Sequence, residues 1–87
     1  MNKSVLEAIE GLVDAIYSPD QEQVDKRFSG LVEELIAFVD AMQKAGYTVD
    51  LTKELMAIQS AYERKDYVEL ADVLLYDMKP EFEGLEV

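Results

Sequence analysis

Apolar residues recur every three or four positions along almost the whole chain, which predicts amphipathic helices rather than strands. In the first helical stretch the acidic residues occupy the side opposite the apolar stripe. Breaks in the period divide the chain into four helices, expected at about 3–17, 19–45, 51–64 and 67–79. The predicted inner residues of the first, third and fourth helices are Val5, Ile9, Leu12, Val13, Ile16, Leu51, Leu55, Ile58, Tyr62, Tyr67, Leu70, Ala71, Leu74, Leu75 and Met78.

Polar residues, proline and glycine mark the expected helix ends. Ser18 is predicted to cap the second helix, with Pro19 in its first position and Gln21 completing a capping box. Gly46 is expected to end that helix in the left-handed conformation. Asp66 has the position of a cap for the fourth helix, and only a residue or two separates that helix from the third. Such a short connection predicts an antiparallel hairpin.

The second predicted helix has the widest apolar surface. At 100° per residue its apolar arc covers roughly 160°, more than one neighbouring helix needs, so this helix is expected to be the central element. Its main stripe consists of Val24, Phe28, Leu31, Val32, Leu35, Val39 and Met42, and Ile36 and Phe38 widen it on both sides. Gly30 costs about 1 kcal/mol relative to alanine in mid-helix, which we interpret as either a close helix crossing or a bend.

Together these elements predict an all-α fold, a compact four-helix bundle of antiparallel helices. A three-helix arrangement is the alternative if the first helix packs on a second chain. Residues 1–80 are expected to form a single helical domain, because a chain of 87 residues has material for one core. Pro80 is expected to stop the fourth helix, and residues 81–87 are expected to form a frayed acidic tail.

The net charge of the chain limits the kinds of molecule that it can bind. Nineteen acidic residues against eight basic ones give a net charge of −11. That charge repels the phosphate backbone of nucleic acids and anionic lipid surfaces, so direct binding to nucleic acid or to a membrane is not expected. An acidic surface serves solubility or attracts a basic protein partner. Acidic residues interrupt the first apolar stretch and cysteine is absent, so the chain is expected to be cytoplasmic.

The sequence contains few residues that could catalyse a reaction or bind a metal ion. The sequence has no His, Cys or Trp, which removes the usual metal ligands and the side chain that titrates near neutral pH. No catalytic residue, metal or cofactor is therefore predicted. Carboxylate pairs such as Glu33–Glu34 fall on polar helix faces, where solvated acids are expected. An enzyme that uses carboxylates for catalysis is kept as one functional hypothesis. It would require several acids of raised pKa clustered in a cleft.

The hairpin spanning 62–80 contains the run Asp66-Tyr67-Val68-Glu69-Leu70-Ala71-Asp72. This run resembles the helical hairpin of small, uncharacterised bacterial proteins with an Asp-Tyr-Val-x-Leu-Ala-Asp pattern. The resemblance covers about a fifth of the chain, supports the turn and a bacterial setting, and implies no catalytic residue. Acyl carrier proteins and colicin-type immunity proteins are also small, acidic and helical. The Asp-Ser-Leu helix start of the former and the paired tyrosines followed by proline of the latter are absent here.

Candidate contact residues lie outside the predicted inner stripes. On the fourth helix Tyr76 and Val73 are flanked by Glu69 and Asp72, and Met56 is an off-stripe candidate on the third helix. An aromatic and an aliphatic side chain among carboxylates suit a partner with apolar and basic character. The alternative is that Tyr76 and Val73 pack under the first helix or the tail.

The sequence therefore favours a noncatalytic protein-interaction module, such as a small helical adaptor, a chaperone-like binder or a regulator. Its partner is expected to be another protein or a second copy of the chain, in a homodimer. The alternative function is that of an acidic inhibitor or immunity-like protein that occupies a basic nucleic-acid-binding surface. Binding of that kind would weaken sharply with salt.

Overall fold

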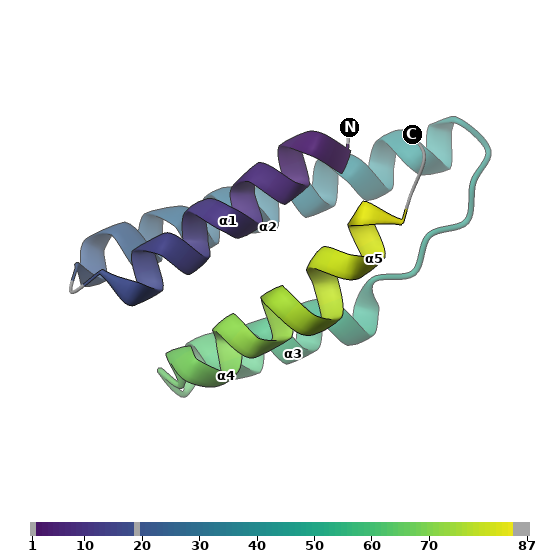
Figure 1. Cartoon of the computed structure of the whole chain (residues 1–87). Helices are drawn as coiled ribbons and strands as arrows, with labels where there is room; N and C mark the ends of the chain where they lie inside the picture. Colours follow the sequence, from purple (N-terminus) through teal and green to yellow (C-terminus); the bar gives the residue numbers. More distant parts are fainter. Residues whose placement is uncertain (1, 19, 85–87) are drawn as a thin grey trace.

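The computed structural model describes residues 2–18 and 20–84, and it confirms the all-α four-helix bundle (Figure 1). Three helices come first, and the fourth is a continuous run of three segments. The elements are α1 (Asn2–Tyr17), α2 (Gln21–Lys44), α3 (Thr52–Glu63), α4 (Tyr67–Asp72), the π-helical segment η1 (Val73–Met78) and α5 (Lys79–Glu83). Among the described residues there is no strand, and no helix combines the length and apolarity needed to cross a membrane.

The helices form two antiparallel hairpins that stack as two layers (Figure 1). One layer holds α1 and α2, the other holds α3 and the α4–α5 run, and the connection over 45–51 passes between the layers at one end of the bundle. The principal extents are 41 × 20 × 19 Å. Helix α1 packs against α2 and also against α4, η1 and α5, whereas no Cα atom of α2 lies within 8 Å of a Cα atom of α3. The central helix is therefore α1, and the prediction that the second helix is central is wrong.

Most of the core comes from the predicted apolar stripes, which meet between the two layers, although Ala61 and Phe82 were not among the predicted inner residues. Val5, Ile9 and Leu12 of α1 are fully buried, in keeping with the central place of that helix. The buried residues after α1 are Val24, Leu31, Leu35, Phe38, Met42, Leu51 in the connection before α3, Ile58, Ala61, Leu70, Ala71, Leu74, Met78 and Phe82. Full burial of one large aliphatic or aromatic side chain contributes about 1.5–3 kcal/mol relative to exposure. Gly30 faces open space rather than a close helix crossing.

The start of α2 differs from the prediction. Asp20 caps the helix, and its Oδ1 accepts a hydrogen bond from the Gln23 backbone N–H at 3.4 Å. Ser18 instead closes α1, because its own backbone N–H donates to the carbonyl oxygens of Asp14 and Ala15. Both residues are good caps, and Asp20 has the advantage of a charge that stabilises the helix N-terminus. Pro19 lies outside the described residues.

Among the described residues, two helices end in a left-handed residue. Gly46 has φ of 93°, as predicted, and the next N–H, of Tyr47, donates to the Met42 carbonyl at 2.9 Å. At the end of α3 the same geometry is adopted by Lys65, with φ of 56°, and the Asp66 N–H donates to the Ala61 carbonyl at 2.9 Å. Asp66 then caps α4 as predicted, because its Oδ1 accepts from the Glu69 N–H.

The fourth helix does not stop at Pro80, and the frayed-tail prediction is wrong for residues 81–83. In η1 the wider π turn makes hydrogen bonds five residues apart, such as the one from the Lys79 N–H to the Leu74 carbonyl. Proline lacks an N–H and its ring clashes with the carbonyl four residues earlier in a regular helix. We attribute the continuation through Pro80 to this wider turn, which relieves the clash. Helix α5 thereby brings Phe82 into the core, 0% exposed. Residues 85–87 lie outside the described residues.

Candidate functional site

The predicted contact surface on the fourth helix is only partly assembled. Tyr76 is 74% exposed, as the contact hypothesis requires, whereas Val73 is half-buried and packs against the core. Both side chains border a groove of about 320 Å³ between α3 and η1. The other residues of that groove are Lys53, Glu54, Ala57 and Asp77.

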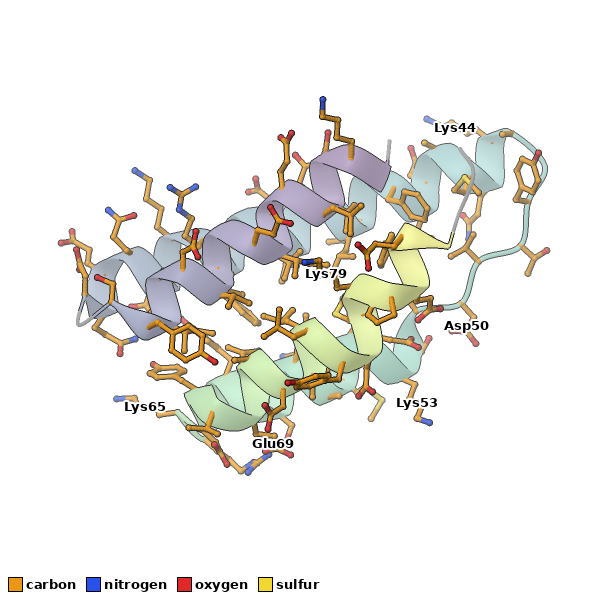
Figure 2. The ribbon with its side chains drawn as sticks, viewed as in Figure 1. Lys44, Asp50, Lys53, Lys65, Glu69 and Lys79 are labelled. Atoms are coloured by element: carbon orange, nitrogen blue, oxygen red, sulfur yellow. The ribbon has the colours of Figure 1, made fainter. Side chains whose placement is uncertain are left out.

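The remaining predicted contact residues lie elsewhere. Glu69 pairs with Arg64 beside the α3–α4 turn, towards the opposite end of the hairpin from Lys53 (Figure 2). Asp72 is exposed on α4, and Met56 is 67% exposed on α3, but neither borders the groove of Tyr76. The structure therefore brings Val73 and Tyr76 together and leaves the other three apart.

Two acidic side chains, Glu54 of α3 and Glu81 of α5, approach each other. Partial desolvation raises the pKa of Glu81, which is exposed overall, and the neighbouring Glu54 carboxylate raises it further by repulsion and by a hydrogen bond. The Glu54 atom Oε2 is buried and has no hydrogen-bond partner. Within residues 2–18 and 20–84, no group of three or more acidic side chains is placed to hold a metal ion. The raised pKa of Glu81 means that desolvation and the nearby Glu54 carboxylate disfavour its charged form in the folded protein.

A more extensive apolar surface lies on the open side of the bundle, between α2 and α3. We call it the α2–α3 groove. It has a volume of about 380 Å³, and most of its lining is apolar. Its residues are Phe28, Val32 and Ile36 from α2, and Leu55, Ile58, Gln59, Tyr62 and Glu63 from α3. Ile36 is 60% exposed, although it belongs to the apolar arc of α2.

Tyr62 closes one end of the α2–α3 groove and joins its two walls. Its ring stacks on Phe28, with centroids 3.9 Å apart and planes inclined by 6°. Its hydroxyl donates to Asp25 Oδ1, which also accepts from Gln21 Nε2 at 3.1 Å. The same Gln21 amide donates to the hydroxyl oxygen of Tyr67 at 2.6 Å, so α2 is tied to α4 as well. The bond to Asp25 raises the pKa of Tyr62 to about 12, because deprotonation would remove the donor and place two negative charges together.

The rim of the α2–α3 groove is acidic. Glu33 and Asp40 are both exposed and stand one helical turn before and after Ile36, so they share its side of α2. Glu63 borders the groove on the α3 wall. The basic side chain on this part of α2 is Lys44, which pairs with Asp40 at 3.0 Å. The groove is therefore an apolar floor between acidic edges.

One sequence feature indicates this groove, although the sequence does not show that the surface stays uncovered. The wide arc of the second predicted helix is the same surface that includes Phe28, Val32 and Ile36. A central second helix would have neighbouring helices over this arc. Since α1 is central instead, part of the arc has no helix over it.

Comparison with known proteins gives a family. Residues 1–86 match the family described as a domain of unknown function, DUF8042. Neither the curated proteins nor the solved structures give a match. Because the matched region spans nearly the entire sequence, the chain belongs to the DUF8042 family.

Proposed function

We propose that this domain is a noncatalytic protein-interaction module and that the α2–α3 groove is its main contact surface. The supporting observation is the apolar lining of that groove on the open side of the bundle, with Ile36 largely in water. Contiguous exposed apolar surface of this kind is typical of interaction sites, because solvent contact is unfavourable until a partner covers it. Tyr76 and its smaller groove provide a second contact surface on the other face of α3.

The noncatalytic part of the proposal is supported by where the ionisable side chains lie. Among the described residues, every buried side chain is apolar. Charged side chains on a solvated surface suit solubility and the steering of a partner more than proton transfer. We propose the cytoplasm as its compartment, since a chain without cysteine needs no oxidising environment.

Affinity capture from a native extract, with two matched variants, tests this function. Ile36→Asp places a charge in the groove, and Val68→Asp places the same charge on α4, where Val68 is 75% exposed and borders none of the grooves. Both variants are expected to keep the helical circular dichroism spectrum, because both positions are exposed. A protein retained by the wild type and by Val68→Asp but lost with Ile36→Asp supports the proposal. Failure to find any protein with that dependence refutes it.

The acidic-inhibitor alternative draws its support from the net charge of −11. It places the contact on carboxylates rather than on the apolar floor. Such a complex would survive Ile36→Asp and dissociate as salt is raised. The same pair of variants, assayed at low and high salt, therefore separates the two functions.

A further inference from the structure

We infer that the α2–α3 groove receives an amphipathic helix from another protein, one whose apolar stripe is flanked by lysine or arginine. This inference rests on the proposed function and specifies the chemistry of the partner. Three features of the groove carry it, namely its length, its lining and the charge of its rim.

The length of the groove suits a short helical contact. Its α2 wall runs from Phe28 to Ile36 and its α3 wall from Leu55 to Glu63. At 1.5 Å per residue each wall is about 12 Å long, which equals roughly two helical turns. A partner helix of that contact length presents two or three apolar side chains at positions i, i+4 and i+7. Stacked Phe28 and Tyr62 form the floor at one end, and Ile36 is the exposed end of the lining.

The charge of the rim selects the partner. Glu63 borders one wall of the groove, and Glu33 and Asp40 lie on the Ile36 side of the other, Asp40 with its charge partly balanced by Lys44. Basic residues on the flanks of a helix lying in the groove meet opposite charge, whereas acidic ones would be repelled at several positions. A second copy of this chain carries a net charge of −11 and the same acidic rim, so self-association through the groove opposes like charges. The groove is therefore suited to a basic helix from a different protein.

The inference is tested with a synthetic peptide of about fourteen residues, long enough to cover the groove. Its leucines recur at helical spacing on one face and its other positions are mainly lysine. One control peptide has the same composition in scrambled order, and a second has glutamate in place of lysine. Binding to the full chain is followed by NMR chemical-shift perturbation and by fluorescence anisotropy, with wild type, Ile36→Asp and Val68→Asp.

We expect the leucine–lysine peptide to bind roughly tenfold or more tightly than either control, because both the stripe and the flanking charge are needed. Shifts should concentrate on the backbone amides of the groove residues. Ile36→Asp should weaken binding roughly tenfold or more, although it adds an acid, and Val68→Asp should leave it within about twofold. Raising salt from about 50 to about 500 mM should weaken binding several-fold.

Equal binding of the scrambled peptide, shifts spread over the whole surface, or insensitivity to Ile36→Asp would each overturn the inference. So would sedimentation showing a homodimer of the free chain that Ile36→Asp dissociates, since the occupant would then be a second copy. In these cases a partner captured from the extract in a groove-dependent way would still support the interaction module. Loss of both results would remove the proposed function as well.

Discussion

Phe82 offers the sharpest test of the bundle, because the structure buries a residue that the sequence places in a tail. Its ring is fully buried and meets the ring of Phe38 edge-on, with centroids 5.0 Å apart and planes inclined by 70°. Phe82→Ala therefore removes a whole aromatic side chain from the contact between α5 and the α1–α2 layer. A cavity remains unless the neighbouring side chains collapse into it.

The expected cost is large for a domain of this size. Phenylalanine-to-alanine changes at fully buried sites reduce the free energy of unfolding by about 3–5 kcal/mol, and small domains have only about 5–15 kcal/mol in total. For 87 residues the entropy of unfolding is about 180 cal/mol/K. A loss of about 3 kcal/mol therefore lowers the Tm by roughly 15 °C.

Thermal and urea unfolding of Phe82→Ala, followed by circular dichroism, measure this cost. Glu83→Ala is the matched control, because Glu83 is the next residue of α5 and is exposed. We expect the control to stay within about 0.5 kcal/mol of the wild type. A double-mutant cycle with Phe38→Leu should give a coupling of about 0.5–1.5 kcal/mol for the ring pair. A cost for Phe82→Ala no larger than that of Glu83→Ala would show that the segment is frayed after all.

Four further substitutions test separate features. Lys65→Gly should raise the free energy of unfolding by about 1 kcal/mol, because Lys65 is left-handed at φ of 56°; an unchanged urea midpoint would contradict this strain. Gly30→Ala should also stabilise α2 by about 1 kcal/mol, since the added methyl meets open space, and a lower Tm would show that Gly30 is needed for packing. Glu81 has a raised pKa in the folded state, so its contribution to stability is present below the ordinary glutamate value of 4.5 and is lost as pH rises through the folded value. Glu81→Gln should therefore have a higher Tm than wild type at pH 7 and a similar one below pH 4.5, and a lower Tm at pH 7 would refute the repulsion. In a spectrophotometric titration, Tyr62→Phe should remove the tyrosine that titrates near pH 12, and persistence of that component would place it on another tyrosine.

Local features of the fold were predictable because a few neighbouring residues determine them. Gly46 and Asp66 mark helix ends whose hydrogen bonds join residues close in sequence, and both predictions are confirmed. The apolar stripes also gave the core, since burial follows helical period. The prediction that Ser18 caps the second helix is wrong because Asp20 satisfies the same local rule, and the sequence does not show which N–H groups remain to be satisfied.

Features that depend on contacts between distant segments were not predictable in the same way. Pro80 ordinarily ends a helix, and the sequence gives no warning that a π turn will carry the helix past it to Phe82. The place of α1 at the centre depends on how the two hairpins stack. The candidate site also depends on how the hairpins stack. Ile36 of α2 and Tyr62 of α3 border one groove only because the two hairpins pack on each other.

The π turn also makes the spacing within 73–78 as important as the residue types there. Deleting one residue from that stretch would restore ordinary turns of 3.6 residues, which looks favourable for a helix taken alone. It would also return the clash between the Pro80 ring and the carbonyl four residues earlier, so the helix would break there and Phe82 would lose its contact with Phe38. Relatives that keep both the proline and the later aromatic residue should therefore tolerate substitutions in this stretch far better than changes in its length.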